Sequence, residues 1–312
     1  MSRLSLRAVP PSAYGFIAAA ILWALTLWFS GGHGGYDTLM VSLSFAIFAV
    51  IVGTGQMFVI ASGAGNIDLS CPAVITLAAY ISMNLMGGEG SMLAPGLAAA
   101  LAVGMAIGLA NFGLIRLFGI PPIIATLASS FIVMSIAMRA GGQSTIKPPA
   151  ALADFAVWRI AGLQVMLVLA LAGSVAAQLL INRSIFGRRL LAVGQNERAA
   201  ILAGIHAHRI RLAAYVISGG LSALTGFLLA GFTGGAALNM GDSYLMESVA
   251  VAVLGGTSVA GGRANALGIW GAAMFLSLLT TLLNTSGVEA GWRFLLMGAV
   301  IIAVIVLATR RR

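Results

Sequence analysis

The sequence has few charged residues, one cysteine and one lysine. Charged side chains make up 8% of its 312 residues, whereas soluble domains carry about 25%. Cys71 has no partner for an intrachain disulfide, so cysteine content does not indicate whether the protein is in an oxidising or a reducing compartment. Lys147 lies in QSTIKPP and not in the GxxxxGK[ST] pattern of a phosphate-binding loop. We therefore expect no Walker-type ATPase site in this chain.

Residues that build catalytic and metal sites are also scarce. His206 and His208 are two positions apart, so a helix would point them to different faces, and no acid or cysteine completes a metal site. His33 stands alone in a glycine-rich turn. No set of nucleophile, base and orienting group is visible. We expect no enzyme active site, no bound metal and no cofactor in this chain.

The hydrophobic content is high and decides the class of protein. Hydrophobic residues make up 60% of the chain, and apolar runs of about 18 residues or more recur, which is typical of membrane-spanning helices. The formal net charge of +9 matters less than its placement in so apolar a chain, and we expect no nucleic-acid partner. The sequence predicts an all-α membrane protein with one bundle, residues 1–312.

We predict about ten spans, some of them short or broken. They are residues 14–29, 38–61, 73–86, 94–117, 123–138, 163–181, 212–232, 244–259, 264–283 and 294–308. The first resembles a signal-peptide core, but no convincing cleavage site follows it, so we expect it to be retained. Gly104 and Gly108 in the fourth have a spacing that lets two membrane helices pack closely.

The distribution of basic residues predicts the orientation. Ten spans place both termini on one side, and 13 of the 17 basic residues then fall on that side. An excess of Lys and Arg marks the cytoplasmic side of membrane proteins. The predicted topology has cytoplasmic termini, a cytoplasmic tail at 1–11, a periplasmic loop at 139–162 and a cytoplasmic loop at 183–211.

The loop at 183–211 carries six basic residues against a single acid, Glu197. Asn196 is a good helix N-cap, and Gly204 suits the left-handed residue that ends a helix. A helix of about two turns is therefore predicted at 197–203. Small side chains on one of its faces would let a partner's backbone approach: Ala199, Ala200 and Ala203. A docking element and a solvated basic loop both remain open on spacing alone.

Polar residues at membrane depth are the second group of candidates. A charge at mid-bilayer costs about 2.5–3.5 kcal/mol on insertion scales, so such residues tend to face a cavity or a partner. Asp68 and Asn66 lie in a glycine-rich break, and Glu247 lies one turn into the eighth span. Uncharged candidates for a solute path are Gln56, Asn84, Asn111 and Asn239. There are alternatives to a role in the solute path. Asp68 could cap the helix that begins near Pro72, and the amides could form hydrogen bonds between helices.

Four motifs in order resemble a known family. They are GNIDLS (65–70), IPPIIATLASSFIVMSIAMRAGGQ (120–143), LLAVGQNERAAILAGI (190–205) and AVLGGTSVAGGRANALG (252–268). The chain resembles the permease subunits of bacterial ABC importers of the ribose, or monosaccharide, type, within the branched-chain amino-acid and sugar permease superfamily. The similarity runs from about residue 38 to 308, and the third and fourth motifs together are specific.

The resemblance implies partners and a mechanism. Two permeases, as homodimer or heterodimer, would enclose a central path in the bacterial inner membrane. A tandem-domain ATPase would bind ATP and Mg²⁺ and dock on the cytoplasmic side, and a periplasmic solute-binding protein would deliver the sugar. The short helix would be the coupling element, through Gly194, Asn196, Glu197, Ala199, Ala200 and Gly204. ATP-driven closure would move it and open the path by alternating access.

Departures from the family pattern fall where a path would be lined. The usual GGIDLSVG has Asn66 for a glycine and Cys71-Pro72 for Val-Gly, and Glu247 replaces an aspartate near the eighth span. They leave open which pentose, hexose or polyol is carried. Three rival functions also remain. They are a branched-chain amino-acid permease, an ion-coupled secondary transporter with Asp68 as its only candidate carboxylate at mid-depth, and a structural or channel-like membrane protein that needs no ATPase.

Overall fold

The computed structural model describes residues 13–30, 34–141 and 147–287, with 289, 291–292, 295–296, 298–299 and 302 beyond them. The α-helices are α1 (Ala13–Phe29), α2 (Gly35–Ala61), α3 (Cys71–Met86), α4 (Leu93–Phe118), α5 (Pro122–Gly141), α6 (Ala150–Val157), α7 (Val165–Arg183), α8 (Ile185–Gln195), α9 (Glu197–Leu202), α10 (Ala207–Thr233), α11 (Tyr244–Leu254) and α12 (Ala266–Thr285). A 3-10 turn, η1 (Gly90–Met92), precedes α4, and β1 (Arg159–Ile160) pairs antiparallel with β2 (Leu163–Gln164).

Nine of these helices coincide with the first nine predicted spans. Within the described ranges, six are long and apolar enough to cross a membrane, and α1, α3 and α11 are shorter apolar helices. The prediction of an all-α membrane protein is therefore confirmed. The tenth predicted span, 294–308, falls mostly outside the described residues, and the tail at 1–11 and His33 fall wholly outside them. The count of ten and the side on which the termini lie stay predictions.

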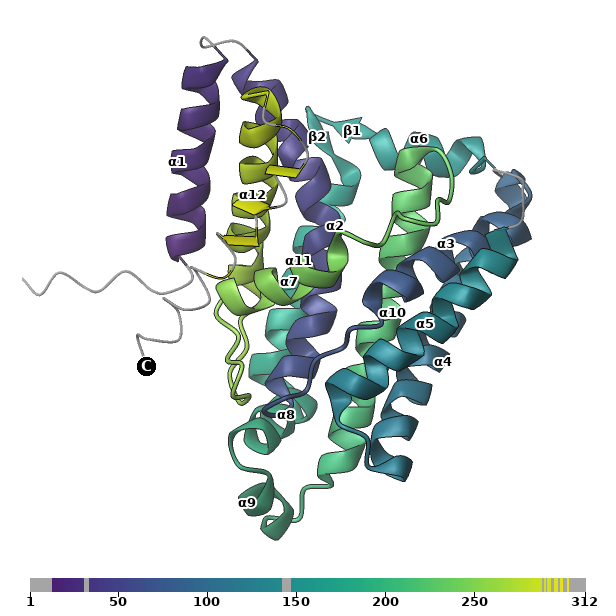
Figure 1. Cartoon of the computed structure of the whole chain (residues 1–312), viewed down its shortest axis with the longest axis vertical. Helices are drawn as coiled ribbons and strands as arrows, with labels where there is room; N and C mark the ends of the chain where they lie inside the picture. The colour runs from purple at the N-terminus through teal and green to yellow at the C-terminus, as the bar shows by residue number, and fades with distance from the viewer. Residues whose placement is uncertain are drawn as a thin grey trace, which may run out of the picture.

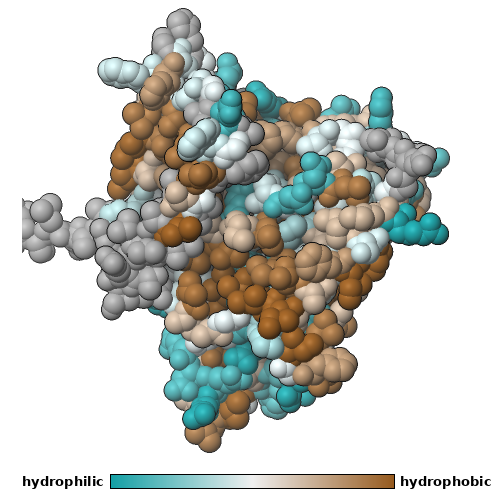
Figure 2. Space-filling model, viewed as in Figure 1, coloured by the Kyte–Doolittle hydropathy of each residue, from teal (hydrophilic) through white to brown (hydrophobic). Residues whose placement is uncertain are grey.

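The bundle has two different ends. The short helices α8 and α9 lie at the lower end in Figure 1, and α6 with the β1–β2 pair lies at the upper end. Two further arginines lie near α8 and α9. Arg116 lines a pocket together with Glu197 of α9, and Arg263 follows Gly262, which Gln195 of α8 contacts. Arg116 and Arg263 are therefore at the lower end, with the arginines of α8 and α9. We call this the arginine-rich end. Figure 2 shows hydrophilic residues gathered there, below a hydrophobic band.

Two predicted loops contain regular structure. The segment at 183–211 forms α8, α9 and the start of α10, which begins five residues earlier than predicted. Leu190 and Val193 of α8 are buried while Arg188 and Arg189 are exposed. This amphipathic pattern supports a helix that covers the end of the bundle. The loop at 139–162 likewise contains α6 and strand β1.

Glycines bring α4 and α10 into close contact. A Cβ added at Gly104 would overlap the carbonyl oxygen of Gly219, and one at Gly108 would overlap that of Tyr215. The close packing predicted from the spacing of these two glycines is confirmed. Backbones that approach this closely gain dispersion contacts along the whole crossing.

The two halves of the bundle repeat one arrangement. Both α2 and α10 have 27 residues, and each is followed by a glycine-containing break and a shorter helix, α3 or α11. Each shorter helix packs against the long helix of the other half, α3 on α10 and α11 on α2. Gly241 contacts Pro72 so closely that a Cβ would overlap the Pro72 carbonyl. The second break therefore contacts the start of α3, directly after the first break.

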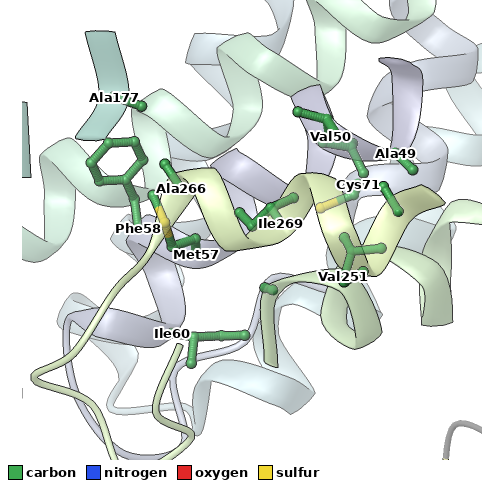
Figure 3. Close-up of a cluster of buried hydrophobic side chains, with 14 of the residues drawn as sticks. Ala49, Val50, Met57, Phe58, Ile60, Cys71, Ala177, Val251, Ala266 and Ile269 are labelled. Atoms are coloured by element: carbon green, nitrogen blue, oxygen red, sulfur yellow. The ribbon is translucent and has the colours of Figure 1, made fainter. Parts of the chain in front are cut away.

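Helix α2 forms the centre of the main core. Nearly every residue from 46 to 61 is buried, which fits an α2 sequence that is apolar on all sides. Figure 3 shows Val50, Phe58 and neighbouring α2 side chains against residues of α3, α7, α11 and α12. The core thereby joins the helices of both halves around one helix.

Candidate functional site

The short helix α9 forms where the sequence predicts it. The Asn196 Oδ1 accepts a hydrogen bond from the Ala199 N–H at 3.0 Å, which caps the helix. Gly204 has a φ of +81°, and its N–H donates to the Ile201 carbonyl at 2.9 Å. Both caps are local interactions, so the helix begins and ends within one residue of the predicted range 197–203.

The faces of α9 differ from the expected alanine face. Ala200 is 4% exposed and packs into the main core, whereas Ala199 is exposed. The most exposed apolar side chains are Leu202, at 89%, and Ile201, at 54%. The surface available to a partner is therefore the apolar tip Ile201–Leu202, which the sequence analysis did not predict. The sequence feature that could have indicated it is a pair of large apolar residues just before Gly204, the glycine that ends the helix.

An ion pair holds α9 against α10. The Arg211 guanidinium makes two hydrogen bonds to the Glu197 carboxylate, Nη1 to Oε1 and Nη2 to Oε2, each at 2.8 Å. Arg211 Nε also donates to the Ser62 carbonyl at 3.4 Å. Because Ser62 begins the first break, the Arg211 side chain connects the start of α9 to the segment that follows α2. Glu197 acts in this structure as a positioning residue for α9.

Gly194 seats α8 against the bundle. A Cβ at this position would overlap the Ala61 carbonyl oxygen and the Gly262 N–H, so only glycine fits. The neighbouring Gln195 Nε2 donates to the Gly262 carbonyl at 3.1 Å. Gly194 and Ala200 are thus buried against the chain itself, while Asn196, Ala199 and Gly204 are exposed.

The first break, residues 62–70, is centred on Asp68, whose side chain is 2% exposed. Its Oδ1 accepts hydrogen bonds from the Ser70 N–H at 3.0 Å and the Ser70 hydroxyl at 2.6 Å. Its Oδ2 accepts from the Ser218 hydroxyl of α10 at 2.9 Å. Asn111 of α4 donates to the Ser70 hydroxyl at 2.8 Å. Asp68 therefore joins the break to α10, and Ser70 joins it to α4.

Two of the candidate amides support the same break, Gln56 from α2 and Asn66 from within the break. With its amide oriented to satisfy both atoms, Gln56 donates to the Asp68 carbonyl and accepts from the Asp68 N–H, each at 3.2 Å. Asn66 is 6% exposed and donates to the Gly63 carbonyl at 3.2 Å. Gln56, Asn66 and Asp68 are thus brought together, and their side chains support the broken backbone.

The other candidates share no hydrogen bond with this break in the described part of the chain. Asn84 is exposed and donates to the Ala140 carbonyl at 2.7 Å, which links the ends of α3 and α5. Asn239 is exposed in the second break, residues 234–243. Glu247 lies in the first turn of α11, partly buried and without an ion-pair partner among the described residues.

A pocket of about 830 Å³ at the arginine-rich end adjoins both α9 and the first break. Asn66, Glu197 and Arg211 are among its lining residues, as are the exposed His206 and His208. The two imidazole centroids are 6.0 Å apart, and the described residues contain no cluster of three or more metal-ligating side chains. The pocket thus adjoins both α9 and the first break.

The family follows from comparison with known proteins. Residues 38–305 match the family described as branched-chain amino acid transport system / permease component. The chain belongs to this family. Its matched range begins at the fourth residue of α2 and contains α3 to α12, with both breaks and α9.

Curated relatives support the same assignment. The chain is 31% identical over 277 residues to the autoinducer 2 import system permease protein LsrD of Photorhabdus laumondii, across 86% of this chain and 82% of that protein. It is 31% identical to the LsrD protein of Yersinia enterocolitica (86% and 83% covered) and 30% identical to that of Salmonella typhimurium (86% and 82% covered). No solved structure matches the chain.

Proposed function

We propose that this chain is the permease subunit of an ATP-driven importer and forms the membrane path for a sugar: a pentose, a hexose or a polyol. The family match over residues 38–305 supports a transport permease. The observation that carries the proposed coupling to a motor is α9, a capped helix with an exposed apolar tip at the arginine-rich end. Ile201 and Leu202 would insert into a groove of the partner.

The partners follow from this role. A separate tandem-domain ATPase binds ATP and Mg²⁺ and contacts α9, so this chain itself is non-catalytic. A second permease, identical or related, completes the path, and a periplasmic solute-binding protein meets the end that carries α6 and the β1–β2 pair. The arginine-rich end is cytoplasmic, and the protein lies in the bacterial inner membrane, in agreement with the Lys/Arg bias.

The mechanism uses the Arg211 side chain, which links α9 to the first break. When the ATPase moves α9, the bidentate Glu197–Arg211 pair carries the displacement to the base of α10 and to Ser62. Asp68 is bonded to Ser218 on the same helix α10, about two turns further along. The pull on α10 therefore reaches both ends of the break that leads into α3, and this opens and closes the path.

Resemblance to known permeases narrows the range of candidate solutes. The sequence motifs are those of sugar-type permeases, and the named function of the LsrD relatives is autoinducer 2 import. The substrate panel should therefore contain pentoses, hexoses, polyols and autoinducer 2, with branched-chain amino acids as the competing class. Asn66, Asp68, Glu247 and Asn239 remain candidates for the path, with Gln56 and Asn84.

The test is to assemble the chain with its ATPase and binding protein in vesicles, and to measure ATP hydrolysis and uptake across this panel. We expect a sugar with its binding protein to stimulate both activities. Uptake driven by a proton or sodium gradient without ATP would support a secondary transporter instead. Stimulation by leucine or isoleucine alone would support the amino-acid class.

A matched pair of substitutions tests the docking surface. Leu202→Asp places a charge on the exposed tip of α9, and we expect co-purification of the ATPase to fall by about tenfold or more, as for a buried anchor residue of an interface. Leu238→Asp, at a leucine that is 44% exposed in the second break, should leave the complex intact. Equal binding by both variants would contradict the docking role of α9.

A further inference from the structure

A deep apolar groove runs along α7, between that helix, α2 and α10. Its volume is about 870 Å³, and α6 adjoins the end of it away from α8. From Met166 to Leu180 the α7 wall covers 14 residue steps, or about 21 Å at the helical rise. One leaflet of the hydrocarbon core is about 15 Å thick, half of the whole. The groove therefore extends through more than one leaflet.

The groove offers no free polar group to a solute. Thr54 and Ser174 are the only polar residues among the described side chains that line it. The Thr54 hydroxyl donates to the Val50 carbonyl at 2.7 Å, and the Ser174 hydroxyl donates to the Ala170 carbonyl at 2.9 Å and accepts from Trp270 Nε1 at 2.9 Å. Such a surface suits hydrocarbon and is unsuited to a sugar.

Two arginines lie at the end of the groove nearest α8. The α7 wall includes Leu169, Gly173, Ala176 and Leu180, and this helical spacing continues to Arg183, one turn beyond. The Arg188 guanidinium donates to the Arg183 carbonyl at 2.8 Å. Both side chains are exposed, and the only ion pair among the described residues is Glu197–Arg211. Arg183 and the Arg188 guanidinium thus lie at the α8 end of α7, and a guanidinium group binds phosphate well.

We infer that this groove binds a phospholipid with an anionic headgroup. One acyl chain lies along α7 in the groove, and the phosphate contacts Arg183 and Arg188. Anionic lipids give the cytoplasmic leaflet its negative potential, which agrees with the side proposed for the arginine-rich end. The inference requires only that the chain lies in a bilayer, so it holds or fails independently of the solute and of the ATPase.

The test uses the full-length chain in phosphatidylcholine vesicles that contain phosphatidylglycerol with a diazirine on its acyl chain. After illumination, labelled peptides are mapped by mass spectrometry, and label is expected to concentrate on residues 165–183 of α7. Gly173→Trp should remove most of it, because a Cβ at Gly173 has no neighbour within 4 Å and the indole would fill the groove. Gly113→Trp on α4, an equally open position, is the matched control and should label as the unsubstituted chain does.

The arginines are tested separately. The double substitution Arg183→Gln and Arg188→Gln should reduce the preference for phosphatidylglycerol over a phosphatidylcholine probe by about fivefold for each arginine removed. Labelling by the phosphatidylcholine probe itself should not change. These exposed substitutions keep the inference testable even if Gly173→Trp does not fold.

Three results would overturn the inference. The first is equal labelling of α7 and of exposed α5 residues such as Ile132, which is 63% exposed, because this indicates ordinary surrounding lipid. The second is unchanged labelling in Gly173→Trp. The third is cross-linking of a photoreactive residue at position 173 to a polypeptide and not to lipid, because the groove would then be a protein interface.

Discussion

The two helix breaks have equivalent places in the two halves of the bundle, yet their polar residues are held differently. In the first, Asp68 is buried and bonded to Ser70 and Ser218. In the second, Asn239 and Asp242 are exposed. A buried carboxylate with three hydrogen bonds fixes a backbone segment, whereas exposed amides and carboxylates leave it free to contact other molecules. Polar residues in a broken membrane helix thus serve two purposes, and residue type alone does not distinguish them.

The glycine contacts also show that the first break's side of the bundle is held more rigidly. A Cβ at Gly226 of α10 would overlap the Ile75 backbone of α3, whereas a Cβ at Gly53 of α2 would overlap only the Val251 side chain. Side chains can move to another rotamer, but packed backbones cannot. The α3–α10 contact is therefore the more rigid of the two.

The largest expected effect is that of Asp68→Ala. It leaves the Ser70 N–H and the Ser218 hydroxyl without an acceptor in a buried site, and we expect a loss of roughly 3 kcal/mol in the free energy of unfolding. The matched change in the second break, Asp242→Ala, should cost under about 0.5 kcal/mol. Thermal unfolding in detergent measures both. Equal losses would remove the distinction between the breaks.

Gly226→Ala should have the next largest effect. Overpacking against a backbone costs about 1–3 kcal/mol, partly offset by the gain of about 1 kcal/mol in helix propensity. Gly53→Ala should cost less, and the added change Val251→Ala should restore its stability, because the overlapping methyl group is removed. The same unfolding assay applies. A larger loss for Gly53→Ala than for Gly226→Ala would show that the α2–α11 contact is the rigid one.

Arg211→Ala should have little effect on the free energy of unfolding but a strong effect on the coupling of ATP hydrolysis to uptake. The side chains of the ion pair are 23% and 42% exposed, so its loss should cost under about 1 kcal/mol. Uptake per ATP hydrolysed should fall, because α9 loses its link to Ser62. Arg209→Ala, at an exposed arginine of the same helix, is the control. Normal coupling in Arg211→Ala would refute the proposed route from α9 to the first break.

Asn239→Ala, like Asp242→Ala, should change stability by no more than about 0.5 kcal/mol. Asn66→Ala should cost about 1 kcal/mol, because it loses a hydrogen bond to the Gly63 carbonyl. If the second break contacts the solute, Asn239→Ala lowers uptake although the protein remains as stable as before. Unfolding and uptake are measured on the same preparation. Unchanged uptake in this variant would exclude a path role for the Asn239 side chain.

The predicted features that the structure reproduces depend on neighbours in the sequence. The α9 caps, Asn196 and Gly204, act within a few residues of their own position, so their types and spacing predict the helix. Gly104 and Gly108 likewise lie one turn apart on a helix and mark its contact face. The buried side of α9 was not predictable in this way, because neighbouring helical residues differ by about 100° and the rest of the bundle selects the face.

The amino-acid sequence by itself determined that this chain is a helical membrane protein, where most of its apolar helices lie, and that a short capped helix begins at Glu197. Hydrophobic length and local capping carry that information without reference to distant residues. Only the tertiary structure decided that Ala200 faces inward, that Arg211 joins Glu197 to Ser62, and that Asp68 is bonded to Ser218. Asp68 and Ser218 are 150 positions apart, and such pairs form only when the two halves of the bundle pack against each other.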